Sequence, residues 1–444
     1  MQIFNQAKKY HILTYGCQMN VRDSETIAGL MEAIGYCESS SPQEADIVIF
    51  NTCSVRHSAE NRVYGKLGEI NKFKKKNPNL LIALGGCMAQ LPANKSRLKK
   101  NGVDIVFGTH NIHELPLLID EAQSLDSRVY KVWEKEGNII ENIPSINKPG
   151  LLAYVNIMYG CNNFCSYCIV PYTRGRERSR QPDDILNEIN KLSEQGYKEI
   201  TLLGQNVNSY GQGLADKFDF SDLLGEASKI ESIHRIRFMT SHPKDISDKL
   251  INTIASNKKL CEHIHMPLQA GSNDILKSMN RGYNREHYQD LTRKIRAAIP
   301  DVSITSDLIV GFPGESEQDF LQTLEMVEKI KFDAAFTFMY SVRTGTRAAD
   351  LENQVTLAEK KERLSRLNEL QYSIAAAVNK SLIGSVQEVL VEGLSKTNPD
   401  MLTGRTRNNR ILIFSGAKDL IGSFKNVRIT RSTTFSLFGE LINY

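Results

Sequence analysis

Three cysteines within eight residues form the stretch of this sequence that is best suited to chemistry. Cys161, Cys165 and Cys168 have the spacing Cys-x3-Cys-x2-Cys, so all three thiolates can reach one metal centre. A cubane iron–sulfur cluster normally takes four thiolates, one on each iron. Three cysteines therefore leave one iron open, where a small chelating ligand can bind and be activated, as happens at a catalytic zinc ion.

Two other roles for closely spaced cysteines fit the sequence less well. A structural zinc site would need a fourth Cys or His nearby, and none follows between residues 169 and 180. A disulfide framework is not expected in a chain of 444 residues that has only eight cysteines and no export signal. The spacing therefore favours ligation of an iron–sulfur cluster.

The stretch from Gly160 to Cys168, with the aromatic Tyr167 before the last cysteine, resembles the signature of the radical S-adenosylmethionine superfamily. The resemblance implies that the open iron holds the amine and the carboxylate of S-adenosylmethionine. The cofactors expected from it are this cluster and S-adenosylmethionine itself.

Composition limits the class of protein and its surroundings. With 41% hydrophobic and 24% charged residues, the chain has the balance of a soluble globular protein of two to three domains. Its opening residues lack the apolar core of a signal peptide, and no run approaches the roughly 18 apolar residues of a membrane span. Together with the few cysteines, these features predict a cytoplasmic protein without membrane contact.

The first part of the chain, residues 8–125, has the alternating pattern of an α/β domain. Four short runs have the composition of buried parallel strands, and helix-like segments follow them. The strand-like runs cover residues 11–15, 46–51, 80–84 and 104–107. The helix-like segments include residues 24–34, 59–75 and 112–123. This rhythm predicts a doubly wound parallel sheet.

Three further cysteines follow the first three of these strands. Cys17, Cys53 and Cys87 each stand at a carboxyl end, and the carboxyl ends of parallel strands share one edge where ligands bind. They could therefore meet around a second cluster with one open iron. The alternative is that each is a small buried apolar residue, but three equivalent positions favour ligation.

The middle of the chain has the pattern of a partial barrel. Residues 126–150 show little periodicity and are expected to be a linker. Residues 151–376 contain six strand-like runs, with helices between several of them, which predicts a radical S-adenosylmethionine (βα)6 barrel whose chemistry lies at the strand carboxyl ends. The runs cover residues 152–158, 199–203, 235–239, 263–266, 303–310 and 334–339.

Polar residues at these strand ends are the predicted cofactor-binding residues: Gln205, Ser241, Gln269 and Asp307. By resemblance to the superfamily, the end of the second strand meets the amine of the cofactor, often with Gly-Gly-Glu. Here the sequence is Leu203-Gly204-Gln205, so an amide takes the place of the carboxylate. Asp307 is equally suited to holding a ribose hydroxyl and to capping a neighbouring backbone group.

Arginines occupy every second position just beyond the central cysteines: Arg174, Arg176, Arg178 and Arg180. Alternate residues of an extended segment face one way, so these guanidinium groups could form a phosphate-binding ridge beside the cluster. The alternative is a solvated edge that is partly paired with Glu177. We predict that Arg174, Arg176 and Arg178 contact RNA.

The last part of the chain, residues 377–444, carries the whole net charge of +4, because nine basic residues stand against five acidic ones there. Five short strand-like runs separated by glycines predict a small β-barrel. They cover residues 385–392, 401–405, 410–414, 426–430 and 438–442. The segment resembles the TRAM domain, and Arg405, Arg407 and Arg410 in one turn region are predicted to bind RNA. A barrel that contacts protein is the alternative.

Taken together, the three parts resemble the radical S-adenosylmethionine methylthiotransferases over almost the whole chain. The stretches Tyr15–Asn20 and Cys161–Tyr172 are similar to the branch of that family that acts on tRNA. This resemblance implies two [4Fe-4S] clusters and transfer of a methylthio group to carbon 2 of N(6)-dimethylallyladenosine beside the anticodon. The implied partners are a tRNA anticodon stem-loop and an electron donor such as flavodoxin or ferredoxin, and the chain is expected to act as a monomer.

Three other functions share parts of this pattern. A methylthiotransferase for a ribosomal protein would have both clusters, and one for threonylcarbamoyladenosine of tRNA would have the basic barrel as well. A non-catalytic iron–sulfur protein that binds RNA would explain the clusters and the charge without turnover.

Overall fold

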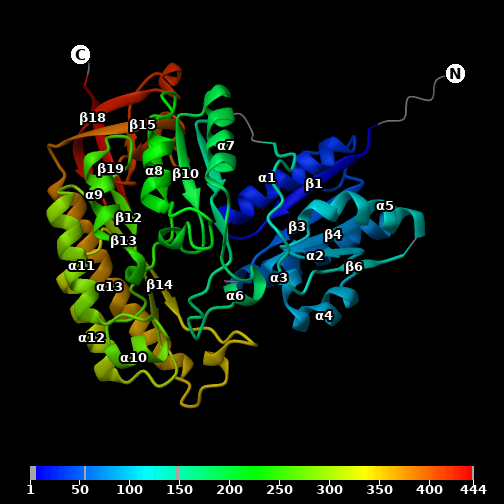
Figure 1. The fold of residues 1–444 in the computed structure, drawn as a ribbon, viewed down its shortest axis with the longest axis horizontal. Coiled ribbons are helices and arrows are strands. Elements are labelled where there is room, and N and C mark those ends of the chain that lie inside the picture. The colour runs from blue at the N-terminus through cyan, green and yellow to red at the C-terminus, as the bar shows by residue number, and fades with distance from the viewer. Residues whose placement is uncertain (1–6, 55–56, 126, 147–149, 443–444) are drawn as a thin grey trace.

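A computed structural model describes residues 7–54, 57–125, 127–146 and 150–442 of the chain. Three units follow one another (Figure 1). The amino-terminal α/β unit, blue to cyan, lies beside a partial barrel drawn in green to yellow, and a small red to orange β-barrel packs against the far end of that partial barrel. The α/β and partial-barrel units predicted from the sequence and the terminal barrel are all present.

A six-stranded parallel sheet forms the core of the amino-terminal unit, in the order β2-β1-β3-β4-β5-β6. Its strands are β1 (Lys9–Thr14), β2 (Cys37–Glu38), β3 (Ile47–Thr52), β4 (Leu81–Gly86), β5 (Ile105–Phe107) and β6 (Val129–Lys131). The helices are α1 (Gln18–Ala33), α2 (His57–Lys76), α3 (Cys87–Gln90), α4 (Lys95–Lys100) and α5 (Leu115–Leu125).

Alternating side chains of the central strand show why helices cover both faces of this sheet. Ile47 and Ile49 of β3 pack with α1 and α5, whereas Val48 and Phe50 pack with α2 and α4. Because successive side chains of a strand point to opposite faces, a strand that is apolar throughout must be covered on both sides. The expected doubly wound arrangement follows directly.

The sheet extends beyond the strands that the sequence predicted. β6 lies within the segment expected to be a linker, and it pairs in parallel with β5 at the edge of the sheet. α1 begins at Gln18 with Cys17 as its N-cap, six residues before the helix expected from residue 24. Both differences arise because short or polar segments gain their structure from tertiary pairing rather than from their own periodicity.

The partial barrel consists of two three-stranded parallel sheets, β11-β10-β7 and β12-β13-β14. A bridge between Ile236 and Leu260 joins them. The strands are β7 (Leu152–Asn156), β10 (Glu199–Leu203), β11 (Arg235–Phe238), β12 (His263–His265), β13 (Ser303–Val310) and β14 (Ala334–Met339), with a small antiparallel pair, β8 (Met158–Tyr159) and β9 (Arg178–Ser179), beside them. The helices are α6 (Val170–Thr173), α7 (Pro182–Glu194), α8 (Phe220–Ser228), α9 (Asp248–Ser256), α10 (Asn273–Ser278), α11 (Arg285–Ala298), α12 (Glu317–Ile330) and α13 (Leu357–Ser381).

The interior of the partial barrel is polar, although its strands are buried. Ile200 and Ile236 pack outward into the hydrophobic core shared with the helices. Their neighbours Glu199, Arg235 and Arg237 therefore point inward. Arg237 pairs with Glu199 at 2.7 Å, and all three charged residues are at least 95% buried.

The terminal unit is a closed five-stranded barrel in the order β15-β16-β17-β19-β18. Its strands are β15 (Val386–Leu394), β16 (Leu402–Thr406), β17 (Ile411–Phe414), β18 (Phe424–Ser432) and β19 (Ser436–Leu441). α13 runs to Ser381, five residues beyond the unit boundary at residue 376 that the sequence predicted. Asn379 in its last turn donates to the carbonyls of Thr433 and Thr434.

The inward-pointing arginines also join the two barrels. Arg235 donates to the carbonyl of Arg405 at 2.9 Å, and Arg237 donates to the carbonyls of Thr406 and Arg407 at 2.8 and 2.7 Å. The terminal barrel thereby closes the amino-terminal end of the partial barrel. The carboxyl ends of the strands remain available for chemistry.

Among the described helices, none combines the length and the apolar character needed to cross a lipid bilayer.

Replacement of Glu199 by Ala tests this junction, because it leaves Arg235 and Arg237 buried without their shared carboxylate. The free energy of unfolding is expected to fall by about 3–5 kcal/mol, measured by urea denaturation of the iron-free chain. Asp290→Ala is the control, since it breaks an exposed pair with Arg293 and should change stability little. Equal effects of the two substitutions would contradict the assigned role of the buried network.

Candidate functional site

The central cysteines lie in a loop that leaves the first barrel strands. Gly160 has a φ of +77°, and a Cβ atom there would stand 2.0 Å from the carbonyl oxygen of Arg176. Only glycine therefore fits, and the backbone N–H of Cys161 donates to the carbonyl of Gly175 at 3.1 Å. This turn brings Cys161 and Cys165, both 9% exposed, to the carboxyl end of the barrel.

The three thiols of this loop influence one another. Burial, with the neighbouring charges of Cys165 and Cys161, raises the pKa of Cys168 to about 12. Binding of a metal at Cys168 would therefore have to displace a proton from this thiol. In the described parts of the chain, no three His, Cys, Asp or Glu side chains are gathered closely enough for one ion. A cluster differs from a single ion, because each of its irons takes a separate thiolate.

A buried arginine that the sequence did not single out contacts this loop. Arg281 follows α10, is 5% exposed, and donates from Nη1 to Sγ of Cys165 at 3.3 Å. The motif Met279-Asn280-Arg281-Gly282-Tyr283 has no metal-ligand spacing, so sequence reasoning had no signal for it.

Buried polar atoms without partners gather at the strand ends near this loop. Gln205 Oε1, Ser241 Oγ and Gln269 Oε1 belong to residues predicted to bind a cofactor, and none has a hydrogen-bond partner among the described residues. The same holds for three atoms that sequence reasoning missed: Asn156 Oδ1, Asn208 Nδ2 and His242 Nε2. Buried polar groups are normally hydrogen-bonded, so this group suits a polar ligand with an amine, a carboxylate and hydroxyls.

The electrostatics of these strand ends keep histidine neutral. Burial, followed by the charges of Arg281 and Lys244, lowers the pKa of His242 to about 2. A neutral imidazole has one donor and one acceptor nitrogen. Nδ1 of His242 accepts from the N–H of Lys244 at 3.4 Å, which leaves Nε2–H as a donor toward a ligand.

Asp307 differs from the other predicted cofactor-binding residues. It lies on β13 directly opposite Phe336 of β14, and its Oδ2 is 3.5 Å from Nε2 of His265. The side chain keeps 30% of its surface exposed. Asp307 therefore points into the barrel, where its partner is His265. It caps no neighbouring backbone group in the described parts of the chain.

The other three cysteines lie at the carboxyl edge of the amino-terminal sheet. Cys17 is the N-cap of α1, Cys53 follows β3, and Cys87 is the first residue of α3 after β4. A Cβ atom on Gly16 would stand 2.9 Å from Cβ of Cys53, so these two loops are in contact. The shared edge brings the loops together, as predicted from the strand order.

Two asparagines hold the cysteine loops together. Asn20 donates to Oδ1 of Asn51 at 3.1 Å, and Asn51 donates to the carbonyl of Asn20 at 2.8 Å. The side-chain oxygen of Asn20 also accepts from the N–H of Cys17 at 3.3 Å. Sequence reasoning missed this pair, although Asn20 stands three residues after Cys17.

The two groups of cysteines lie at the junction of their domains. The side-chain amide of Gln205, at the barrel end, is 2.5 Å from Sδ of Met19, two residues after Cys17. The hydroxyl of Thr109 donates to the carbonyl of Thr173 in α6 at 2.5 Å. The arrangement places both groups on the facing sides of one interface.

Arg174 is a structural residue of this interface rather than an exposed RNA contact. It is 6% exposed, and its Nη2 donates to Oδ2 of Asp23 in α1 at 2.7 Å. Burial opposes its charge, but Asp23 and the thiolates of Cys87 and Cys17 raise the pKa of this guanidinium. The sequence prediction of RNA binding at Arg174 is therefore wrong, because the segment is buried by the neighbouring domain.

The other arginines of this segment do not form a common ridge. Arg176 is exposed and lies over the ring of Phe164 at 4.3 Å, whereas Arg178 is half-buried and donates to the carbonyl of Gly137. Arg180 is buried between Glu141 and Glu188. The segment turns at Gly175, which has a φ of +76°, so alternate residues do not share one face.

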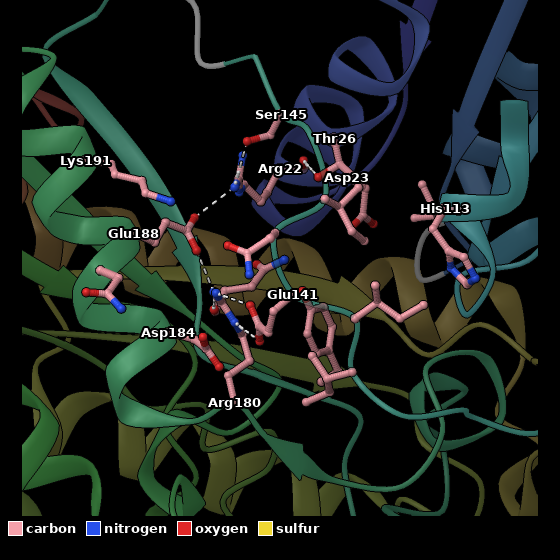
Figure 2. Close-up of a pocket in the computed structure, with 18 of the residues that line it drawn as sticks. Arg22, Asp23, Thr26, His113, Glu141, Ser145, Arg180, Asp184, Glu188 and Lys191 are labelled. Atoms are coloured by element: carbon pink, nitrogen blue, oxygen red, sulfur yellow. Dashed lines mark hydrogen bonds and ion pairs between the residues drawn. The ribbon is translucent and has the colours of Figure 1, made fainter. Parts of the chain in front are cut away.

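A polar cavity of about 690 Å³ lies between α1, α7 and residues 138–145. Figure 2 shows Glu188 between Arg22 and Arg180, with Glu141 on the other side of Arg180. None of the six cysteines lines the cavity. Its charges pair across the junction, which indicates a seam between domains rather than the centre of the chemistry.

Two of the three basic residues predicted on the terminal barrel are also engaged. Arg407 pairs with Glu262 at 2.6 Å, and Arg410 pairs with Asp333. Both carboxylates belong to the partial barrel, so these arginines fasten the terminal barrel to it. The side chain of Arg405 is 40% exposed. Its Nη1 donates to Oδ1 of Asn409 at 3.2 Å, and its Nε lies 3.8 Å from Glu392, so it has no close carboxylate partner among the described residues.

Family comparisons agree with the three structural units. Residues 9–108 match the uncharacterized protein family UPF0004, residues 155–327 match the Radical SAM superfamily, and residues 380–442 match the TRAM domain.

Curated relatives resemble the chain over nearly its whole length. A tRNA-2-methylthio-N(6)-dimethylallyladenosine synthase of Syntrophomonas wolfei is 67% identical over 435 residues, which cover 98% of both chains. The protein of the same name from Carboxydothermus hydrogenoformans is 52% identical, over 98% of this chain and 99% of its own.

Solved structures share the fold at low sequence identity. The radical S-adenosylmethionine methyltransferase TsrM from Kitasatospora setae has a TM-score of 0.56 and 12% identity, covering 78% of this chain and 77% of its own. The radical enzyme OxsB has a TM-score of 0.53 and 11% identity, covering 83% of this chain and 58% of its own.

Gly86→Ala tests the geometry that presents Cys87. Gly86 has a φ of +90° and a ψ of −165°, and an added Cβ would stand 2.4 Å from the carbonyl oxygen of Thr52. A non-glycine residue in this region costs about 1–3 kcal/mol before any overlap is counted. Urea denaturation should show at least that loss, whereas Gly196→Ala, with φ +88° and open surroundings, should lose less. An equal loss in both variants would show that the contact with Thr52 has no role.

Proposed function

The chain belongs to the family of tRNA-2-methylthio-N(6)-dimethylallyladenosine synthases, and on that premise we propose which of its residues carry the reaction. It is a radical S-adenosylmethionine enzyme that transfers a methylthio group to N(6)-dimethylallyladenosine in tRNA. The observation that carries this conclusion is the 67% identity with a synthase of that name over 98% of both chains.

Membership of the Radical SAM superfamily implies a [4Fe-4S] cluster and S-adenosylmethionine. We assign the ligands of this cluster as Cys161, Cys165 and Cys168. Their support is the shared loop at the barrel end, where Cys161 and Cys165 are both buried. With three protein thiolates, one iron is left for the amine and carboxylate of S-adenosylmethionine.

The residues that would hold S-adenosylmethionine surround this loop. Gln205, Ser241 and Gln269 have buried side-chain oxygens without protein partners, and these oxygens would accept from the amine and the hydroxyls of the ligand. Asp307 would accept a hydrogen bond from a ribose hydroxyl of the ligand. Its contact with Nε2 of His265 would orient that imidazole ring. Asn156 and His242 extend the set that sequence alone suggested.

We assign a second [4Fe-4S] cluster to Cys17, Cys53 and Cys87. Its support is the contact between the Gly16 and Cys53 loops and the influence of both Cys17 and Cys87 on Arg174. Arg174 and Asp23 would then form part of the wall of this site. The pair would also hold α6, which follows the first cluster loop, against the second cluster.

The reaction requires such cofactors because the side chains of proteins cannot activate an aromatic carbon–hydrogen bond by acid–base chemistry. When bound, the clusters and S-adenosylmethionine supply the electron, the carbon radical, the sulfur and the methyl group. The protein residues bind and orient these groups.

The TRAM domain and the tRNA-modifying relatives support tRNA as the partner. We propose that an anticodon stem-loop contacts Arg176 beside the first cluster loop and Arg405 on the terminal barrel. Both guanidinium groups are accessible, unlike those of Arg174, Arg407 and Arg410. Phosphate contacts of this kind position the nucleic acid and do not read its sequence.

Three sequence expectations stay as proposals. A flavodoxin or ferredoxin would supply electrons, because the chemistry needs a one-electron donor. A cytoplasmic location fits a tRNA substrate and reduced thiols. A monomer is the simplest state in which one chain contains both cysteine groups.

The alternatives have less support. The relatives described above have names that specify dimethylallyladenosine rather than threonylcarbamoyladenosine or a ribosomal protein. A non-catalytic RNA-binding protein would release no deoxyadenosine when incubated with S-adenosylmethionine and a reductant.

Separate removal of the two cysteine groups tests the cluster assignments. Replacing Cys161, Cys165 and Cys168 by Ala should leave about half of the iron and abolish cleavage of S-adenosylmethionine. Replacing Cys17, Cys53 and Cys87 should also halve the iron, preserve that cleavage and eliminate the methylthio product. Iron analysis, deoxyadenosine release and mass spectrometry of tRNA nucleosides are the measurements. Full iron content in either variant would refute the corresponding ligand set.

Salt dependence of tRNA binding tests the accessible arginines. The logarithm of the tRNA binding constant falls with the logarithm of the salt concentration. Arg176→Gln and Arg405→Gln should each make this slope less steep by about one unit. Arg293→Gln, at an exposed position of α11, should leave the slope unchanged. Arg410→Gln should instead reduce stability, because it leaves Asp333 buried without its partner. An unchanged slope for Arg176→Gln and Arg405→Gln would exclude this binding surface.

A further inference from the structure

Arg281 is held rigidly beside the central cysteine loop. Its Nη1 donates to Sγ of Cys165 at 3.3 Å, its Nη2 donates to the carbonyl of Pro267 at 2.9 Å, and its Nε donates to the hydroxyl of Tyr283 at 3.1 Å. The side chain is 5% exposed. Each edge of the planar guanidinium therefore has a fixed direction, and one of them faces a cysteine sulfur.

The charge of Arg281 has no carboxylate partner in the part of the chain that the structure describes. Its contacts are a thiol, a carbonyl and the hydroxyls of Tyr283 and Tyr167, with the Tyr283 ring 5.3 Å away. Other arginines of similar burial are paired: Arg237 with Glu199 at 2.7 Å, and Arg363 with Glu315 at 2.9 Å. Burial of a cation without a charged partner is unfavourable, so the position favours an anion close to this guanidinium.

The anion that the site can provide is the thiolate group of the cysteine loop. Nη1 of Arg281 donates to Sγ of Cys165, and Cys161 and Cys168 belong to the same short loop. Three thiolates around an iron–sulfur core form an assembly with net negative charge. This assembly would offset the buried cation in the way that a carboxylate does elsewhere in the barrel.

We propose that Arg281 is the counter-ion and hydrogen-bond donor of the iron–sulfur cluster on Cys161, Cys165 and Cys168, and that it raises the reduction potential of that cluster. The inference rests on the ligand assignment of the proposed function. One-electron reduction makes the assembly more negative by one charge, so a buried cation stabilises the reduced form more than the oxidised form. Hydrogen bonds to cluster sulfurs act in the same direction.

Arg281 is a positioning residue in this proposal, because it acts through the thiolate of Cys165 and not on the substrate. Its second anchor, the carbonyl of Pro267, belongs to the segment that ends at Gln269, one of the proposed cofactor-binding residues. The same guanidinium therefore fixes the distance between the cluster loop and this part of the ligand site. Lysine would keep the charge but would lose the planar set of three directed bonds.

The test measures the reduction potential in a chain that keeps one cluster, with Cys17, Cys53 and Cys87 replaced by Ala. Dithionite supplies the electrons, viologen dyes mediate, and electron paramagnetic resonance reports the reduced cluster. Arg281→Gln should shift the potential to more negative values, and Arg281→Lys should give a smaller shift in the same direction. Lys277→Gln is the control, because it removes an exposed cation of α10 four residues away, and it should leave the potential unchanged.

Two results would overturn the proposal: a potential in Arg281→Gln equal to that of the parent chain, or a shift in Lys277→Gln as large as in Arg281→Gln. If Arg281→Gln does not retain iron, the reduction potential of Arg281→Lys is the test instead. A potential of Arg281→Lys equal to that of the parent chain would then contradict the proposal. Methylthio product formed by the unaltered chain is measured separately on tRNA. Failure of the proposed function would therefore appear in that assay and not in the potentials.

Discussion

Buried charge at the junctions between units is the constraint on which the rest of this structure depends. Arg174 of the barrel segment pairs with Asp23 of α1, and Arg237 pairs with Glu199 while it donates to backbone carbonyls of the terminal barrel. A charge removed from water is tolerated only with a well-placed partner. The Arg237 hydrogen bonds thereby join the terminal barrel to the partial barrel. The Arg174–Asp23 pair lies at the junction where the two groups of cysteines face each other.

This constraint gives the basic residues of the chain different roles. Arg174, Arg407 and Arg410 lie between units and have carboxylate partners, whereas Arg176 and Arg405 keep accessible guanidinium groups. The net charge of the last part of the chain therefore overstates the charge available to a polyanion. Two of its arginines, Arg407 and Arg410, pair with carboxylates of the partial barrel and so attach the terminal barrel to it.

The carboxyl ends of the barrel strands show the opposite situation. There, several buried polar atoms have no hydrogen-bond partner among the described residues, among them Gln205 Oε1 and Ser241 Oγ. Buried polar groups are normally hydrogen-bonded, so a group of such atoms at the strand ends suits a polar ligand that would complete them. The site for a polar cofactor is thus recognisable from unmet hydrogen bonds as well as from its cysteines.

The sequence by itself indicated the spacing of the six cysteines, the three units and most of the strands, because ligand spacing and apolar periodicity are local properties of a chain. The short strands β2, β6, β8 and β9 were not predicted. The sequence also determined that Cys17, Cys53 and Cys87 share an edge, since parallel strands have a common carboxyl end. Only the tertiary structure decided which groups Arg174, Arg281 and Arg407 contact. The sequence does not show whether an arginine contacts water, a carboxylate or a cysteine sulfur. Residues more than 100 positions apart, such as Arg281 and Cys165, form contacts that no local sequence pattern predicts.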